Sequence, residues 1–317
     1  MSKRVVFIGS SEWGLRSLRV LTELDDIEVV GAVTNPAVFK ISYSPDGVRN
    51  VHHADVPSFC EENDISTYLM GSDEPMKSPR LMEVLEAWAP DYFFALGWYH
   101  VIPAPIRELA PVLGIHYSLL PDYSGGAPLV WAMINQEQIV GATLFQLDGG
   151  IDTGPIIGQA HAVVHPRETI KRLYDRVGEI SLELLRFELP RFVREELSST
   201  VQASEGRRVF PQRSPEDGLI DWSHSAAQID AFIRAQSRPY PGAFTRLNEQ
   251  LTQIWRATPF IESNDGPTGS MFSDNDQVFI RCASGIIRLD EVEIAGRVYQ
   301  AEHVVDAVMG ERAQRRA

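Results

Sequence analysis

Cysteine is scarce in this sequence, and long hydrophobic runs are missing. The two cysteines, Cys60 and Cys282, lie far apart and form no CxxC pair, which argues against a disulfide framework and a structural zinc site. We expect both side chains to be buried. No apolar stretch approaches the roughly 20 residues of a membrane-spanning helix, and residues 1–8 enter a strand-like run without a cleavable signal pattern. These features predict a cytoplasmic protein with no membrane partner.

Positive charge is also in short supply. The chain has 29 Lys and Arg residues against 43 Asp and Glu residues, which gives a net charge of −14. A protein that holds a polyanion through many phosphate contacts normally displays a basic face. The charge balance therefore argues against extensive nucleic-acid binding and favours small-molecule partners.

A complete dinucleotide-binding motif is missing as well. The segment Gly9-Ser10-Ser11-Glu12-Trp13-Gly14 follows a strand-like run but lacks the GxGxxG spacing that lets a backbone approach a pyrophosphate. This disfavours a nicotinamide-dependent oxidoreductase and favours a plain turn, with Gly9 and Ser10 as candidate contacts to an acceptor substrate. The adjacent His52 and His53 lack metal-ligand spacing, so we expect no metal.

The first half of the chain alternates strand-like and helix-like segments. Residues 5–8, 29–33 and 92–96 are apolar and strand-like, and residues 12–24 form an amphipathic helical pattern. Short connections between these segments predict right-handed crossovers in a mostly parallel, Rossmann-like α/β sheet. Residues 35–64 lose this periodicity and are predicted to form an irregular, substrate-binding loop.

The second half has a different composition. We predict a catalytic domain over residues 1–195, a polar linker over 196–210 and a small β-rich domain, an OB-like barrel, over 211–317. Its short strand-like runs, separated by Asn, Asp and Gly, are residues 253–257, 277–281 and 285–289.

Two polar, glycine-rich segments carry the chemistry. The run of residues 114–128 contains His116, and the run of residues 148–154 contains Asp152. Each run is flanked by apolar, strand-like sequence, which is how catalytic groups are often presented on loops. This pairing predicts an enzyme.

These segments resemble the folate-dependent formyltransferase family. The family pattern is Asn-x-His followed by Ser-Leu-Leu-Pro, here residues 118–121, and a downstream Asp-x-Gly. Residues 214–222 and 238–244 are similar to the start of the C-terminal domain of those enzymes. The resemblance implies transfer of a formyl group from 10-formyltetrahydrofolate to a primary amine.

The acceptors of this family include methionyl-tRNA and nucleotide-linked amino sugars. Because the chain is acidic, we expect a small-molecule amine, a nucleotide-linked amino sugar, with methionyl-tRNA as the alternative. The alternative from another functional class is a folate-binding homologue with weak catalytic activity. A homodimer through the C-terminal domain is compatible with the resemblance but is not encoded in the pattern.

Formyl transfer defines the expected roles of the two catalytic residues. A neutral amine attacks the formyl carbon, and negative charge develops on the formyl oxygen. His116, oriented by Asp152, is expected to donate a hydrogen bond to that oxygen, and Asp152 is expected to receive the ammonium proton.

The sequence departs from the family at one catalytic position. Gly114 stands where the pattern has its asparagine, and loss of one oxyanion donor typically costs on the order of 10² to 10³ in rate. Three explanations stay open. The side chain of His100 or Tyr117 replaces the donor, the Gly114 N–H replaces it, or the protein binds folate without efficient transfer.

The resemblance also implies contacts to the pterin and to the histidine turn. Ser118 and Pro121 belong to the turn that aims His116, Pro121 is a candidate acceptor contact, and a cis bond before Pro121 is compatible with such a turn. The expected donor contacts are Trp98, Tyr99, Val101, Ile102, Asp148, Gly149 and Gly150.

Overall fold

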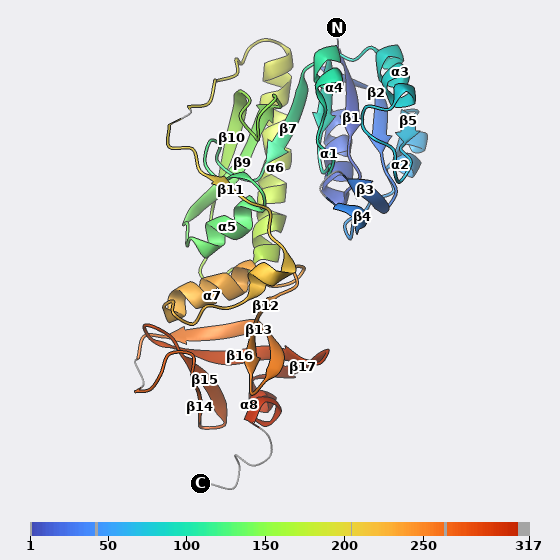
Figure 1. Cartoon of the computed structure of the whole chain (residues 1–317). Helices are drawn as coiled ribbons and strands as arrows, with labels where there is room; N and C mark the ends of the chain where they lie inside the picture. Colours follow the sequence, from blue (N-terminus) through green and yellow to red (C-terminus); the bar gives the residue numbers. More distant parts are fainter. Residues whose placement is uncertain (1, 42–43, 204, 263–264, 310–317) are drawn as a thin grey trace. The chain divides into compact units, whose positions relative to one another are not determined.

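The computed structural model describes residues 2–41, 44–203, 205–262 and 265–309 (Figure 1). Contacts within the chain divide it into two compact units, described separately below. Unit 1 comprises residues 1–124, 141–162 and 177–209, and unit 2 comprises residues 125–140, 163–176 and 210–317. Residues 125–140 and 163–176 thus group with the C-terminal part, whereas the sequence predicted one boundary near residue 195.

Unit 1 is built on a seven-stranded sheet in the order β10-β9-β7-β6-β1-β2-β5. Neighbouring strands from β7 to β5 run parallel, and β9 is antiparallel to β7. This confirms the predicted mostly parallel, Rossmann-like sheet. The strands are β1 (Lys3–Ile8), β2 (Ile27–Thr34), β5 (Ser66–Leu69), β6 (Tyr92–Ala95), β7 (Val112–His116), β9 (Ile139–Gln146) and β10 (Ile156–Val163).

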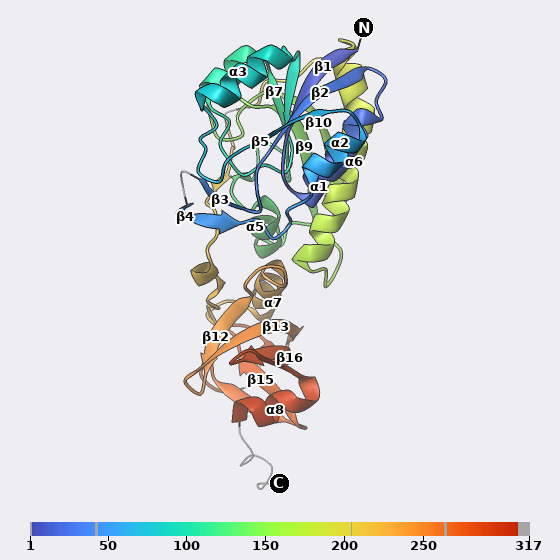
Figure 2. The same ribbon diagram turned by 90° about the vertical axis from the view of Figure 1, so that its right-hand side faces the viewer.

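Helices cover both faces of this sheet (Figures 1 and 2). Phe7 of β1 packs with α1 (Glu12–Thr22), α2 (Val56–Glu62) and the later part of α6 (Ile170–Val193). Ile8 faces the opposite side, with α3 (Pro79–Trp88) and α4 (Ala104–Leu109). Successive side chains of a strand point to opposite faces, so the apolar run in β1 fills two cores. Burial of each such side chain contributes about 1.5–3 kcal/mol.

The loops that follow β1 and β6 meet at the point where the strand order reverses. The sheet grows from β1 towards β5 on one side and resumes at β6 on the other, which is the usual ligand position in open α/β sheets. Ser11 caps α1 by accepting a hydrogen bond from the Gly14 N–H at 3.1 Å. A Cβ on Gly14 would lie 2.5 Å from the Leu96 carbonyl oxygen, so this glycine permits close packing of the two loops.

Residues 35–64 are more regular than predicted. They form a hairpin of β3 (Val38–Ile41) and β4 (Ser44–Arg49), followed by α2. The expectation of an irregular loop was wrong, because a proline does not end a helix when it lies in its first turn. Pro57 occupies that position in α2, and Asp55 caps the helix by accepting from the Ser58 N–H.

Unit 2 contains an antiparallel sheet in the order β12-β13-β16-β15-β14, with β17 paired to β16. The predicted strand-like runs lie in β13, β15 and β16, which confirms a C-terminal β domain. The elements are α5 (Pro128–Ile134), α7 (Ala226–Ala235), β12 (Ala243–Leu247), β13 (Gln250–Phe260), β14 (Met271–Asp274), β15 (Gln277–Arg281), β16 (Ile286–Ile294), β17 (Arg297–Gln300) and α8 (Ala301–Met309).

The core of unit 2 lies between this sheet and two helices (Figure 2). Ile229 and Ile233 of α7 and Val304 of α8 are buried with the sheet residues. The remaining short elements of the chain are β8 (Ser124–Gly125), β11 (Val209–Phe210) and η1 (Pro215–Gly218).

Both cysteines are buried and unpaired, as predicted: Cys60 lies in the core of unit 1 and Cys282 in that of unit 2. Within the described ranges, no helix combines the length and the apolar character that crossing a bilayer requires.

Two helical glycines of unit 1 should respond in opposite ways to alanine. At Gly14 the new Cβ would lie 2.5 Å from a backbone oxygen, whereas at Gly178 of α6 its nearest neighbour is Trp13 Cδ1 at 3.4 Å. We expect Gly14→Ala to destabilise the protein by about 1–3 kcal/mol through overpacking. Gly178→Ala should instead stabilise it by roughly 0.5–1 kcal/mol, because alanine is the better helix former.

Urea denaturation of the two variants measures this difference. Equal stabilities would contradict the close packing of the β1 and β6 loops.

Candidate functional site

His116 and Asp152 come together although 35 positions separate them in the sequence. His116 ends β7, Asp152 lies in the loop after β9, and the distance from His116 Nδ1 to Asp152 Oδ2 is 3.7 Å. Both side chains are largely buried, at 13% and 22% exposure. The gap exceeds a hydrogen bond, and catalytic contacts of this kind are often long before substrate binds.

A carbonyl oxygen fixes the orientation of the His116 ring. His116 Nε2 lies 2.8 Å from the carbonyl oxygen of Tyr123. Because a carbonyl only accepts, Nε2 must carry a proton and donate. Nδ1 is therefore the ring nitrogen that faces Asp152 and remains for chemistry.

Gly114 lies inside the sheet, two residues before His116 and on the same face. It pairs with Ala95 of β6 on one side and with Phe145 of β9 on the other. Its N–H is therefore directed at a neighbouring strand, which removes the backbone of Gly114 as a substitute oxyanion donor. A Cβ at this position would lie 2.7 Å from Leu147 Cδ1, so Leu147 covers the space above the glycine.

Tyr117 points to the other face of the sheet. Its ring packs edge-on against Trp13 of α1 with centroids 5.5 Å apart, and burial raises the pKa of its hydroxyl. The side chain lies against Trp13 and Gly178, on the α1 and α6 side, whereas His116 faces the opposite way. Of the two side chains considered as replacements for the missing asparagine, Tyr117 is thus in the wrong place.

His100 lies in the loop that follows β6. It stacks on Trp98 with centroids 5.0 Å apart, and Trp98 and Leu147 pack against the same apolar cluster. Its Nε2 lies 3.2 Å from Asn35 Nδ2, and burial lowers the pKa of His100 from the ordinary 6.5. His100 is therefore neutral at pH 7. With the amide assigned this way, Nε2 accepts and Nδ1 carries the proton.

Asn35 and Asn50 contact predicted site residues, although the sequence did not single them out. Asn35 follows β2 and is 1% exposed, and its Oδ1 has no hydrogen-bond partner among the described residues. Asn50 Nδ2 donates to the Ser10 carbonyl at 3.2 Å, and Tyr99 donates to Asn50 Oδ1 at 3.1 Å. The position of Asn35 directly after a parallel strand was the available signal.

The remaining predicted contacts differ in exposure. Gly9 and Ser10 are buried beneath the loops, and Ile102 belongs to the apolar core. Val101 is 71% exposed, and Trp98 Nε1 is buried without a partner among the described residues. Asp148, Gly149 and Gly150 are exposed, with Asp148 Oδ1 accepting from the Gly150 N–H at 2.9 Å. Ile102 therefore supports the site from the core.

Ser118 and Pro121 shape the turn after His116. Ser118 donates to the Asp122 carbonyl at 2.7 Å, and the Pro121 carbonyl accepts from Ser124 Oγ at 3.1 Å. The Leu120–Pro121 peptide bond is cis. These contacts hold the turn whose Tyr123 carbonyl binds His116.

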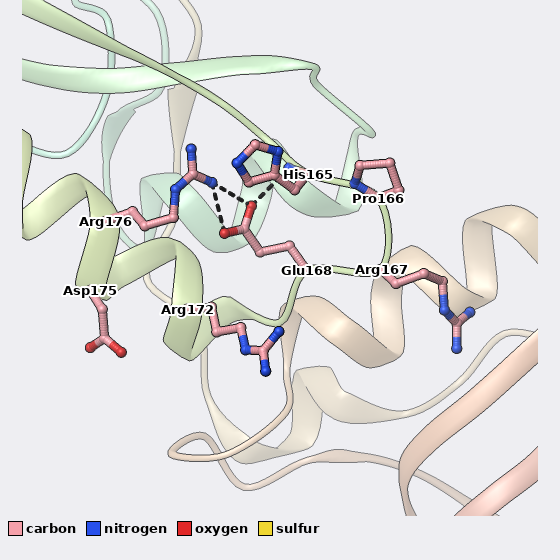
Figure 3. A pocket seen from close by; sticks show the side chains of 7 residues that line it. All are labelled: His165, Pro166, Arg167, Glu168, Arg172, Asp175 and Arg176. Atoms are coloured by element: carbon pink, nitrogen blue, oxygen red, sulfur yellow. Dashed lines mark hydrogen bonds and ion pairs between the residues drawn. The ribbon is translucent and has the colours of Figure 1, made fainter.

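A cavity of about 420 Å³ in unit 2 contains none of the predicted site residues (Figure 3). Its centre is an ion pair in which Arg176 donates to both oxygens of the buried Glu168 at 2.8 Å. Both groups are satisfied within the protein. In the part of the chain that the structure describes, no group of three His, Cys, Asp or Glu residues is arranged to hold a metal.

Comparison with known proteins identifies the family. The formyl transferase model matches residues 3–186, and the model of the formyl transferase C-terminal domain matches residues 213–306. Two curated relatives are the methionyl-tRNA formyltransferases of Desulfotalea psychrophila and Myxococcus xanthus. Both are 29% identical over 93% of this chain, and the match covers 90% and 91% of them respectively.

Solved structures share the fold at low sequence identity. The N-formyltransferase from Helicobacter canadensis, in complex with folinic acid and dTDP-3-aminofucose, matches 91% of this chain and 99% of its own, with 19% identity and a TM-score of 0.65. HypX from Aquifex aeolicus in complex with tetrahydrofolic acid matches 98% of this chain, with 18% identity and a TM-score of 0.62. This chain spans about half the length of HypX.

The contact between position 114 and Leu147 predicts coupled substitutions. We expect Gly114→Ala to destabilise unit 1 by about 1–3 kcal/mol, because the new methyl group meets Leu147. Leu147→Ala alone should also destabilise, through lost packing. The double variant should lose at least about 1 kcal/mol less than the sum of the two, as measured by urea denaturation. Simple additivity would contradict the assigned contact.

The environment of His100 predicts a dependence of stability on pH. Because burial lowers its folded-state pKa, the unfolded chain binds a proton at a higher pH than the folded chain does. The free energy of unfolding should therefore decline as pH falls below about 6.5. His100→Gln should reduce this decline, as followed by urea denaturation at several pH values. Parallel stability curves for the two proteins would show that the His100 ring is not protected from protonation.

Proposed function

Because the chain belongs to the formyl transferase family, we propose that it moves the formyl group of 10-formyltetrahydrofolate to a primary amine. The observation that carries the proposal is the meeting of His116 Nδ1 and Asp152 Oδ2 at 3.7 Å. His116 is the last residue of β7, and Asp152 lies in the loop between β9 and β10.

Each group has a defined task in formyl transfer. The amine nitrogen forms a bond to the formyl carbon, and the former carbonyl oxygen becomes negatively charged. Protonated His116 donates from Nδ1 to that oxygen, since Nε2 is already committed to Tyr123. Asp152 receives the proton that leaves the ammonium group, directly or through water. Collapse of the intermediate then breaks the bond to the folate nitrogen, which takes up the proton that Asp152 received, so that the products are the formamide and tetrahydrofolate.

We propose that the side chain of His100 replaces the asparagine that the family pattern has at position 114. It is neutral and retains an Nδ1–H donor, and its neighbour Trp98 packs against the same apolar cluster as Leu147, the residue that covers Gly114. A neutral ring donor can bind the developing oxyanion as an amide N–H does. The alternative of a weakly active folate-binding homologue follows only if this donor is ineffective.

The relatives favour methionyl-tRNA as the acceptor. Both curated relatives are methionyl-tRNA formyltransferases, and they match nearly the whole of this chain. A nucleotide-linked amino sugar is the second candidate, because the net charge of −14 suits a small acceptor with few phosphates. Homodimerisation is not part of this proposal.

Release of tetrahydrofolate from 10-formyltetrahydrofolate tests the reaction and the acceptor together. We expect turnover with initiator methionyl-tRNA, and His116→Ala and Asp152→Asn should each lower kcat by at least about 10²-fold. His100→Phe should lower kcat on the order of 10²-fold while leaving folate affinity within a few-fold. Tyr117→Phe, on the opposite face, serves as the control and should stay near wild type.

Other outcomes of this assay would change or overturn the proposal. Turnover with amino-sugar nucleotides but not with tRNA would make the second candidate the function. Folate binding without turnover on either acceptor would favour the binding homologue, and no folate binding would overturn the proposal.

A further inference from the structure

The segment predicted as a linker lies against the loop that carries Asp152. Thr200 and Ile156 exchange two backbone hydrogen bonds, of 2.8 and 2.7 Å, in an isolated β-bridge. Thr200 therefore pairs with the first residue of β10, which follows the Asp152 loop directly. A free linker between domains would lack such pairing.

Gln202 holds the backbone of the Asp152 loop. Its Nε2 donates to the Asp152 carbonyl at 2.9 Å and to the Gly154 carbonyl at 2.7 Å. The two N–H groups of one amide thus bridge carbonyls on either side of Thr153. Nearby, Arg207 Nη2 donates to the Ile151 carbonyl.

The backbone held in this way is strained. Asp152 has φ of 53°, in the left-handed region that costs a non-glycine residue roughly 1–2 kcal/mol. That conformation persists only where surrounding contacts fix it, and the Gln202 amide supplies two of them. Because a side chain follows its backbone, the same contacts set the direction of the Asp152 carboxylate.

The oxygen atom of the Gln202 amide indicates that this side chain has a role besides packing. Gln202 Oε1 is buried and has no hydrogen-bond partner among the described residues. An unsatisfied buried oxygen costs stability, so packing alone would favour an apolar side chain at this position. A buried polar atom without a hydrogen-bond partner is a departure from the usual packing rules that is expected at functional sites.

We propose that Gln202 is a positioning residue, which holds the Asp152 carboxylate opposite His116 Nδ1. This inference rests on the proposed function. It adds a residue from outside the catalytic loops, and it makes Thr200, Gln202 and Arg207 part of the active-site framework. Displacement of a catalytic group by about 1 Å can cost on the order of 10² in rate.

Two near-isosteric variants test the proposal. Gln202→Leu removes both N–H donors and the orphan oxygen, and Gln202→Glu keeps the shape but replaces the donors with a carboxylate. We expect each to lower kcat by about 10- to 100-fold, with KM for the folate changed by less than about three-fold. Gln228→Leu breaks a capping glutamine of α7 in unit 2 and controls for a general loss of stability.

A double-variant measurement separates positioning from a structural role. If Gln202 acts through Asp152, Gln202→Leu should have no further effect on kcat in an Asp152→Asn background. Equal effects of Gln202→Leu in both backgrounds would overturn the proposal, as would unchanged kcat in the single variants.

A readout that needs no turnover keeps this test apart from the proposed function. The ring-nitrogen NMR shifts of His116 report whether a carboxylate lies beside Nδ1. Gln202→Leu should move these shifts towards the values of Asp152→Asn, and Gln228→Leu should not. Unmoved shifts would overturn the positioning role even in a protein that transfers no formyl group.

Discussion

The hydrogen bond from His116 Nε2 to the Tyr123 carbonyl is the constraint on which the rest of the site depends. It commits one ring nitrogen to the backbone and leaves Nδ1 facing Asp152. The turn that supplies this carbonyl is tied down by Ser118 and Ser124, and Arg207 donates to Ser124 Oγ at 3.2 Å. A ring free to rotate would present either nitrogen, so the turn determines which chemistry the histidine performs.

Sheet geometry then decides which residues can assist that nitrogen. Side chains of β7 alternate between faces, which places Gly114 with His116 and sends Tyr117 to the side of Trp13. Strands on both sides of Gly114 occupy its backbone. In our proposal, the donor missing from β7 is supplied by the loop after β6, where His100 contacts Asn35. In that proposal, a residue outside β7 replaces the donor side chain that is missing at Gly114.

The sequence predicted the central strands of unit 1 but not the hairpin and helix within residues 35–64, nor the contacts between distant residues. The apolar patterns of residues 5–8 and 92–96 were sufficient to predict these two strands, because buried parallel strands are continuously apolar. Period-two alternation along β7 also predicts that Tyr117 and His116 point to opposite faces. Gln202 was not predictable, because it lies 50 residues from Asp152 in a polar stretch without periodicity. Polar composition describes an exposed linker and a hydrogen-bonded framework equally well.

Binding of a tRNA acceptor would depend on how charge is distributed as well as on its total. Several arginines of unit 2 are already paired: Arg234 contacts Asp230 at 2.8 Å, and Arg238 contacts Glu291 at 2.9 Å. A guanidinium held by a carboxylate neutralises little phosphate charge, so few counterions would be released when this surface meets tRNA. If methionyl-tRNA is the acceptor, its binding should therefore depend on salt less steeply than phosphate-driven recognition does. In that case, we expect discrimination between acceptors to depend on contacts around the reacting amine, near His116, His100 and Asp152.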